Sequence, residues 1–561
     1  MNYNKSLIGL LLVLIFSPVF VRAQDQDLFE ISKNLDVFTS LYKQIDLNYV
    51  ETVKPGELMK TGIDAMLATL DPYTNYIPES EIEDYRFMTT GQYGGIGATI
   101  HKKGDFLFIS EPYKNSPADK AGLIAGDKVL EINGTSTRNR SVDDASNFLR
   151  GQPGNAIKLL VQRGESKPYE INLNRENIQV ENIPYFGMLD DHIGYLKMNG
   201  FTQNSGNEVK ETLMKLKSQG KLKALVFDLR GNGGGLLNEA VNIANLFIDR
   251  DQLIVSTKGR LASANISYKT MMPAADKDIP LVFLVDKNSA SASEILAGTM
   301  QDLDRAVIIG QRSYGKGLVQ NVLPLSYNSQ VKVTVAKYYI PSGRCIQAID
   351  YSHKDAEGNF GKIPDSLITA FKTKSGRIVY DGGGIEPDVY LSPNRYSDIV
   401  QNLLSKYLIF DFATKFKTQH DSISGPRDFK VTDVVYNDFV SFVKDKGYDD
   451  FVTPAEASLE EMKKNAEKEN DFAPIQEDYL KLKQKIAQLR TQSIYDHKAE
   501  ISKLIRDEIV TRYYYERGRV EASLAADPAV MKAKETLDNE PYYKGILDGT
   551  VKVKAELKPI K

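Results

Sequence analysis

The stretch LVFLVDKNSASASEILAGTMQDLDRAVIIGQRSYGKGLVQ, residues Leu281–Gln320, decides the fold of this chain. Two short apolar runs, Leu281–Val285 and Ala306–Gly310, are bounded by turn residues and flank a helical pattern. Such an alternation predicts an α/β unit with two buried strands. Sheets of this kind carry their chemistry at the carboxyl ends of the strands. Functional residues are therefore expected directly after each run.

Serines and a lysine occupy these two positions. Ser289, Ser291 and Ser293 follow the first run, and Lys316 follows the second in a glycine-flanked turn. A serine hydroxyl is a poor nucleophile until a base removes its proton. A free lysine titrates near ~10.4, and desolvation can lower that pKa by several units. With Tyr314 before it and apolar residues after it, Lys316 can form a Ser–Lys dyad.

Simpler alternatives fit the same residues. Ser291-Ala-Ser-Glu294 also matches a capping box at the start of a helix, and a lysine in a glycine turn is usually only a surface residue. His192, one of five histidines, opens an expected strand and is the alternative base of a Ser–His hydrolase.

Two glycine-rich segments resemble phosphate-binding motifs without matching them. Gly310–Gly317 lacks the final Ser or Thr of a P-loop, and Arg230–Gly235 is followed by Leu236 at the third glycine position of a dinucleotide loop. We interpret Arg230–Gly235 instead as a strand-to-helix turn whose backbone amides bind a developing oxyanion.

Several motifs together resemble the carboxyl-terminal processing (tail-specific) serine proteases. NSASASEILAGTMQDLDRAVIIGQRSYGKGLVQ is similar to their nucleophile and base segment, and FDLRGNGGGL (Phe227–Leu236) to their oxyanion-hole segment. YYIPSGRCIQ and GGGIEPDV (Gly382–Val389) are similar to their later strands, so that the resemblance covers roughly Leu28–Leu391.

The resemblance implies a role for each site residue. Ser291 would be the nucleophile, Lys316 the base, and Gln320 the residue that supports Lys316. The oxyanion donors would be the amide of Ala292 with that of Gly234, or of Gly233 as the alternative. If Gln320 touches Lys316, the chain after Gly315 must bend, because residues four apart on a strand lie roughly 13 Å apart.

Residues 86–176 resemble a PDZ domain. The YGGIGATI turn and strand (Tyr93–Ile100) are followed by SPADKAGLIAGDKVLEING and an expected helix at Val142–Leu149. PDZ domains capture peptides by strand addition and hold the terminal carboxylate with backbone N–H groups. Gly95, Ile96 and Gly97 would form that carboxylate turn.

The ends of the chain have different patterns. Residues 1–23 combine Lys5, an apolar core and a final small residue, which predicts a secretory signal peptide, with an uncleaved anchor as the alternative. Residues 24–85 form a helical region whose family counterpart often contributes to dimer contacts. Residues 396–561 are expected to form a helical accessory domain that supports dimerisation, adaptor binding or substrate gating.

These inferences define an α/β multidomain protein. A helical N-terminal region, a PDZ domain, a crotonase-like α/β serine protease domain (residues 177–395) and a helical C-terminal extension are expected, in that order. The net charge of −3 argues against nucleic acid as a partner. The function expected is an exported, periplasmic endopeptidase that takes unfolded or tagged proteins by their C-termini without metal or cofactor. The alternative is a catalytically inactive PDZ scaffold.

Overall fold

The structure is a computed structural model that describes residues 28–355, 358–393 and 395–551. The predicted signal peptide, residues 1–23, lies outside the described residues. The chain divides into two compact units, one formed by residues 1–76 with 322–333 and the other by residues 77–321 with 334–561. Among the described helices, none has the length and apolar character required to cross a membrane.

A six-stranded sheet forms the centre of the second unit. Its strands, in spatial order, are β10 (Tyr185–Met188), β11 (Ile193–Lys197), β12 (Ala224–Asp228), β15 (Leu281–Val285), β16 (Val307–Gly310) and β23 (Val389–Tyr390). Strand β10 is antiparallel to β11, and the other neighbours are parallel. The buried strands predicted at Leu281–Val285 and near Ala306 are confirmed, and so is the α/β class of this domain.

Helices cover both faces of this sheet, which is why its strands are almost continuously apolar. On one face lie α6 (Ser205–Ser218), α7 (Leu237–Ala244) and α8 (Ala292–Asp302), which share a core with Phe227 and Phe283. On the other face, α15 (Pro528–Asp538) and α16 (Glu540–Asp548) share a core with Val226 and Val282.

The last two helices therefore pack on the six-stranded sheet, although they lie within residues 396–561, which the sequence predicts as a helical accessory domain. The hydroxyl of Tyr543 in α16 accepts a hydrogen bond from the N–H of Leu281 at 3.0 Å and lies 3.2 Å from its carbonyl. An amphipathic pattern shows that one helix face is buried but does not identify the surface that buries it.

The expected PDZ region is an antiparallel sheet with one flanking helix. Its strands are β3 (Ala98–Lys103), β4 (Phe106–Pro112), β5 (Asp127–Ile132), β7 (Ala156–Arg163) and β8 (Tyr169–Asn174), in that spatial order, with β6 (Thr135–Ser136) beside β5. Helix α5 (Val142–Leu149) occurs at the predicted residues and begins with a capping box. Strand β3 is an edge strand, so its outer hydrogen-bonding groups are available to an added strand.

A helical domain follows the catalytic strands. It contains α9 (Asp398–Ser405), α10 (Leu408–Gln419), α11 (Asp433–Val443), α12 (Pro454–Glu469), α13 (Phe472–Asp496) and α14 (Lys498–Ser523). Apolar residues recur at helical spacing from Ile475 to Leu489 and from Ile501 to Ile509, and the two stretches are helical, in α13 and α14 respectively. This domain contacts the PDZ region through a hydrogen bond from the Thr414 hydroxyl to the carbonyl of Ala125 at 3.0 Å.

Shorter elements complete the second unit and its junctions. They are β1 (Asn75–Ile77), α3 (Ile82–Thr90), β2 (Gln92–Gly95), α4 (Pro117–Lys120), β9 (Glu176–Gln179), β13 (Leu253–Gly259), β14 (Ser267–Lys269), β17 (Leu318–Pro324), β18 (Gln330–Tyr339), β19 (Ile349–Lys354), β20 (Phe360–Lys362), β21 (Ala370–Lys372) and β22 (Ile378–Tyr380).

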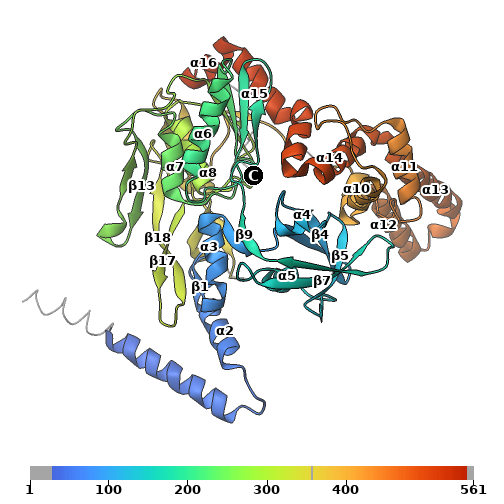
Figure 1. The fold of residues 1–561 in the computed structure, drawn as a ribbon, viewed down its shortest axis with the longest axis horizontal. Coiled ribbons are helices and arrows are strands. Elements are labelled where there is room, and N and C mark those ends of the chain that lie inside the picture. The colour runs from blue at the N-terminus through green and yellow to red at the C-terminus, as the bar shows by residue number, and fades with distance from the viewer. Residues whose placement is uncertain (1–27, 356–357, 394, 552–561) are drawn as a thin grey trace, which may run out of the picture. The chain divides into compact units, whose positions relative to one another are not determined.

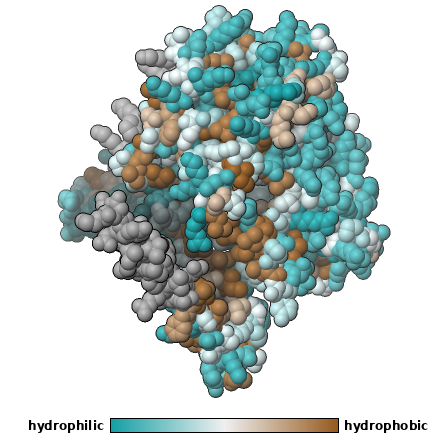
Figure 2. Space-filling view, turned by 90° about the vertical axis from the view of Figure 1, so that its left-hand side faces the viewer, coloured by the Kyte–Doolittle hydropathy of each residue, from teal (hydrophilic) through white to brown (hydrophobic). Residues whose placement is uncertain are grey.

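The first unit contains the predicted N-terminal helices. Residues 28–48 are helical, and α2 spans Pro55–Leu67. Phe29, Leu35 and Leu41 on the first helix are all more than half exposed. On the face of the protein drawn in Figure 2, hydrophilic residues predominate and hydrophobic residues gather toward the middle of the view.

Candidate active site

Ser291 lies between the carboxyl end of β15 and the entirely buried helix α8. Its backbone has φ 55° and ψ −114°, a conformation that a residue with a side chain adopts at a cost of about 1–3 kcal/mol. Strained serines at strand-to-helix turns present their hydroxyl outward as nucleophiles. The half-buried Ser291 therefore has the backbone geometry that a nucleophile requires.

The other two serines of the cluster have structural partners. The hydroxyl of Ser289 donates to the carbonyl of Leu229 at 2.9 Å, and that of Ser293 donates to the carbonyl of Asn232 at 2.9 Å. Both side chains are fully buried. These hydroxyls hold the serine loop against the turn after β12, which leaves Ser291 as the candidate nucleophile of the three.

Lys316 lies in a turn that is packed closely on the chain around Ala348. The neighbouring Gly315 has φ +87°, and a Cβ atom there would lie 2.4 Å from the Cβ of Ala348. The N–H of Gly317 donates to Oε1 of Gln347 at 2.7 Å. Glycine is therefore required at position 315, and the turn keeps Lys316 half-buried rather than fully exposed to water.

One buried carboxylate connects the serine segment to the lysine turn. Oε2 of Glu294 accepts the N–H of Ser291 and the N–H of Lys316, each at 2.9 Å. Its Oε1 accepts the N–H of Gly315 at 2.7 Å and the hydroxyl of Ser313. Glu294 is 1% exposed. The capping-box motif drew attention to this residue, but only the fold shows that the same carboxylate also binds the turn 21 and 22 residues later.

Tyr338 on β18 forms a second connection between these segments. Its buried hydroxyl lies 3.2 Å from the carbonyl of Ser291 and forms a hydrogen bond with the carbonyl of Lys316. Glu294 and Tyr338 thus bind the N–H and C=O groups of both candidate catalytic residues, and no pattern in the sequence indicated Tyr338.

Burial raises the pKa of Glu294 to about 7, although the N–H and hydroxyl groups around it act in the opposite direction. Desolvation disfavours the charged form, whereas hydrogen-bond donors favour it. The carboxyl group is therefore sensitive to pH in the neutral range.

The glycine turn after β12 lies against the candidate nucleophile. A Cβ atom on Gly234, which has φ +98°, would be 2.9 Å from both Ser291 Cβ and the amide nitrogen of Ala292. The N–H of Gly234 donates to Oδ1 of Asn232 at 2.9 Å. Within the described ranges, the amides of Gly233 and Ala292 donate to no protein acceptor. The geometry thus favours Gly233, the alternative of the two glycines, together with Ala292.

Asn232 positions this turn and was not identified from the sequence. The side chain is fully buried, and its amide donates to the carbonyl of Met198 at 2.9 Å. Its backbone carbonyl accepts the N–H of Ala290 at 3.0 Å. Asn232 therefore fixes the glycine turn both to the serine loop and to the residue that follows β11.

Gln320 lies on β17, which begins at Leu318, so the chain is extended from two residues after Lys316. The side-chain amide of Gln320 donates to the Thr334 hydroxyl at 3.1 Å. The support of Lys316 by Gln320 stays a prediction.

The three residues predicted to bind a carboxylate in the PDZ region form a buried turn between β2 and β3. Gly97 has φ +72°, and a Cβ atom there would lie 2.3 Å from the Cβ of Ser116. The carbonyl of Gly97 accepts the N–H of Tyr113 and the hydroxyl of Ser116, both at 2.8 Å. In the described part of the chain, the amides of Ile96 and Gly97 have no protein acceptor, and Gly95 pairs with Glu176.

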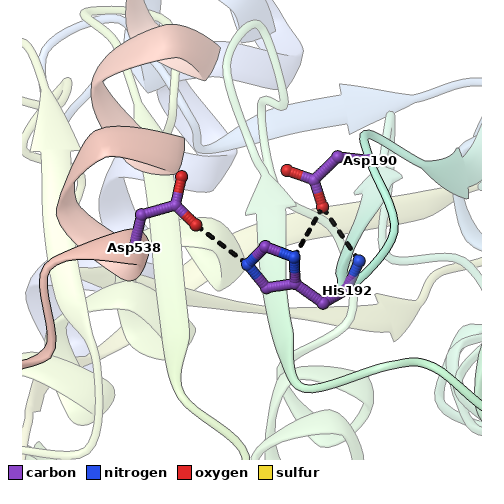
Figure 3. Close-up of side chains that lie close together, drawn as sticks. All are labelled: Asp190, His192 and Asp538. Carbon is purple, nitrogen blue, oxygen red and sulfur yellow. Dashed lines mark hydrogen bonds and ion pairs between the residues drawn. The ribbon is translucent and has the colours of Figure 1, made fainter.

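Figure 3 shows His192 between the side chains of Asp190 and Asp538. His192 lies at the opposite end of the six-stranded sheet from Ser291, which follows β15. It precedes β11, and a five-residue strand separates the two ends by about 16 Å. Its Nε2 lies 2.9 Å from Asp538 of α15 and its Nδ1 lies 3.3 Å from Asp190. This position does not allow His192 to act as the base for Ser291.

Asp190, His192 and Asp538 could by distance hold a metal ion. However, the ammonium of Lys534 lies 2.5 Å from Asp190 and 2.7 Å from Asp538. The hydrogen bond from Lys534 contributes to lowering the pKa of Asp190 to about 2 in spite of the opposing effect of burial. The arrangement is an ion-pair network that attaches α15 to the sheet.

Replacing His192 by alanine is therefore expected to leave peptide hydrolysis within about twofold of the wild type. The unfolding free energy should fall by at most about 1 kcal/mol, because the ion pairs are partly exposed. Steady-state kinetics with an unstructured peptide, together with thermal unfolding, would test this. A loss of activity without unfolding would instead support a histidine base.

Comparison with known proteins agrees with the order of these domains. Residues 108–163 match the family described as PDZ domain, residues 192–353 match Peptidase family S41, and residues 399–537 match the C-terminal helical domain of a probable PDZ-protease.

Individual relatives are similar over more than half of the chain. A carboxy-terminal-processing protease of Bartonella bacilliformis is 34% identical over 321 residues, which are 56% of this chain and 73% of the relative. A probable CtpA-like serine protease of Staphylococcus haemolyticus is 36% identical over 308 residues, 54% of this chain and 61% of the relative. A solved structure titled photosystem II D1 C-terminal processing protease is 27% identical, over 64% of this chain and 92% of that chain, with a TM-score of 0.35.

The PDZ match precedes the S41 match, which contains the glycine turn and the serine and lysine segments, and the Bartonella relative is matched over 73% of its length. This chain therefore belongs to the carboxy-terminal-processing serine proteases of peptidase family S41.

Proposed function

We propose that the protein is an endopeptidase that cleaves by a Ser291–Lys316 dyad. The observation that carries the proposal is the buried Glu294 carboxylate, which binds the N–H groups of both residues at 2.9 Å. These two hydrogen bonds support a fixed position of the Ser291 backbone relative to the Lys316 backbone. Such fixed positioning of a nucleophile and its base is a large part of catalytic rate enhancement.

In the proposed reaction, the Ser291 oxygen attacks the scissile carbonyl while the neutral amine of Lys316 accepts the hydroxyl proton. The amides of Gly233 and Ala292 donate to the oxyanion, each stabilising the transition state by about 3 kcal/mol. Lys316 then returns the proton to the leaving amine, which gives an acyl-enzyme on Ser291. Water hydrolyses this ester with Lys316 again as base, and no step requires a metal or cofactor.

We also propose that the PDZ domain binds the carboxyl terminus of the protein substrate. The support is the edge strand β3 and the acceptor-free amides of Ile96 and Gly97 at its start. A pocket of about 230 Å³ beside this turn is lined by apolar residues that include Ile100, Val142 and Leu149. A peptide that adds to β3 would place its last side chain there and its carboxylate on the two amides.

The test of C-terminal recognition compares one unstructured peptide with a free carboxylate and the same peptide with a C-terminal amide. We expect the amide to raise KM about tenfold or more and to change kcat less. Gly97→Ala should raise KM for the free acid, because the added Cβ meets Ser116, but should leave the amide unaffected. Equal KM values for both peptides would contradict recognition of the carboxylate.

Arg150 is the residue through which the PDZ domain would regulate cleavage. Its guanidinium is paired with Asp84 of α3 and lies 5.3 Å from the ring centre of Tyr93 at the peptide pocket. A bound carboxylate would compete with Asp84 for this charge. Arg150→Ala should be tested with the same two peptides, one with a free carboxylate and one with a C-terminal amide. If the two peptides differ in this variant as they do in the wild type, Arg150 does not couple the PDZ domain to cleavage.

We further propose export to the periplasm by residues 1–23 and self-association through the exposed apolar side chains of the 28–48 helix. Cell fractionation with N-terminal sequencing would test the first. A terminus near Gln24 is expected, Met1 on envelope protein would indicate the uncleaved anchor, and protein confined to the cytoplasm would contradict export. Sedimentation of Leu35→Asp beside the wild type would test the second. A wild-type monomer would exclude self-association and leave an adaptor as the partner of this helix.

A further inference from the structure

An ion cluster lies behind the glycine turn that faces Ser291. Asp228 is fully buried at the end of β12, and Arg230 donates to it from Nε at 3.0 Å and from Nη2 at 2.6 Å. Tyr195 adds a hydrogen bond to Asp228 at 2.6 Å. The neighbouring positive charges of Arg230 and Lys197 hold the pKa of Asp228 below its usual range against the effect of burial.

A second carboxylate in the cluster comes from the far end of the chain. Asp527, between α14 and α15, accepts from Nη1 of Arg230 at 3.0 Å and lies 2.9 Å from its Nη2. The Arg230 and Asp527 side chains are only 24% and 19% exposed. Arg230 is thus enclosed between two carboxylates from elements almost 300 residues apart, and such partly buried ion pairs keep a definite geometry.

We propose that Asp527 is a positioning residue for the catalytic glycine turn. Asp527 touches no reacting atom in this proposal, and its effect passes through Arg230. The backbone from Arg230 leads directly to Gly233, whose amide is the proposed oxyanion donor. This inference rests on the proposed function for its kinetic consequence.

The backbone around Arg230 shows why its guanidinium matters for the turn. The carbonyl of Arg230 accepts the ammonium of Lys197 at 2.5 Å, and the N–H of Gly231 donates to Asp286 at 2.9 Å. Both atoms belong to the peptide group that joins Arg230 to Gly231, so this group is held on both sides. Asp527 adds a second carboxylate partner for the Arg230 side chain beside it. Without Asp527, the net negative charge that surrounds Arg230 decreases and its guanidinium can move toward solvent.

Asp527 also caps α15 by accepting the N–H groups of Ala529 at 2.9 Å and Val530 at 3.2 Å. Any variant must separate this structural role from the positioning role. Asp527→Asn keeps a good cap residue of the same shape and removes only the charge. Asn539→Ala is the matched control, because Asn539 caps α16 through Tyr542 N–H at 3.1 Å and has no contact with Arg230.

The experiment measures kcat and KM of the full chain with an internally quenched unstructured peptide, and hydrogen exchange of the segment 231–234. For Asp527→Asn we expect kcat to fall roughly 10- to 100-fold, since small displacements at a catalytic site have effects of this size. KM and the midpoint of thermal unfolding should stay close to the wild type, and exchange at 231–234 should accelerate. For Asn539→Ala, the unfolding midpoint should fall while kcat stays unchanged.

The outcomes separate this inference from the proposed function. If the wild type hydrolyses the peptide and Asp527→Asn has the same kcat and exchange, the positioning role is wrong. If the wild type does not hydrolyse peptides, the proposed function fails, and the exchange at 231–234 still decides whether Asp527 orders the turn. A fall in kcat that matches the loss of folded protein would also overturn the inference.

Discussion

Replacement of Ser291 by alanine is expected to reduce hydrolysis of an unstructured peptide by at least about 10⁴-fold. Removal of a nucleophile in serine hydrolases typically has an effect of this order, because binding and oxyanion donors remain while covalent catalysis is lost. The fold should be retained, because Ser291 is only half-buried and its backbone conformation, with φ 55°, is about as strained for alanine as for serine. Steady-state hydrolysis and circular dichroism measure the two effects.

Ser293→Ala serves as the matched control for Ser291→Ala. It removes a hydroxyl from the same loop, and this hydroxyl donates to the Asn232 carbonyl. We expect a loss of about 0.5–1.5 kcal/mol in the unfolding free energy, because one buried hydrogen bond is lost while the Asn232 carbonyl still accepts the N–H of Ala290, and much of the activity should persist. Turnover by Ser291→Ala at the wild-type rate would rule out the serine mechanism.

Replacement of Glu294 by glutamine is expected to lower activity at least about 100-fold and to destabilise the protein by about 2–4 kcal/mol. Both oxygens of Glu294 receive two hydrogen bonds each, from Ser291 and Lys316 on one and from Gly315 and Ser313 on the other. A glutamine NH₂ group would face donors whichever way it turned. Peptide kinetics and urea unfolding would show both losses, and an active, stable variant would contradict this role of Glu294.

Glu294 should also affect the pH dependence of stability. Because its pKa rises from 4.5 to about 7 in the folded protein, the folded state binds the proton more tightly than the unfolded state. The stabilisation that this proton gives to the folded state is fully present below pH 4.5 and is lost as the pH rises through 7. The free energy of unfolding should change by about 3 kcal/mol. Urea unfolding at pH 5, 6, 7 and 8 should show a decline that is absent from Glu294→Gln. If the unfolding free energies of the wild type and of Glu294→Gln change in parallel with pH, the Glu294 carboxyl does not titrate in this pH range.

Local periodicity accounts for the parts of the fold that the sequence predicted correctly. Leu281–Val285 is uniformly apolar, and Ala224–Asp228 is apolar up to its last residue, because both faces of their sheet are covered, and the sequence shows this directly. The ends of helices are predicted less accurately. The sequence pattern predicts helices near Ser293–Gln301 and Leu237–Phe247, whereas α8 spans Ala292–Asp302 and α7 spans Leu237–Ala244. Such ends depend on caps and turns that tertiary contacts adjust.

By itself, the sequence determined the order of the domains and the segments that bring serine, lysine and glycine-turn residues to one edge of a sheet. Only the tertiary structure decided that Glu294 binds both candidate segments, that the Gly234 amide is engaged by Asn232, that α15 packs on the six-stranded sheet and that Asp527 pairs with Arg230. The physical reason is that periodicity records whether a side chain is buried, whereas the partner of a buried polar group depends on which distant segments pack together.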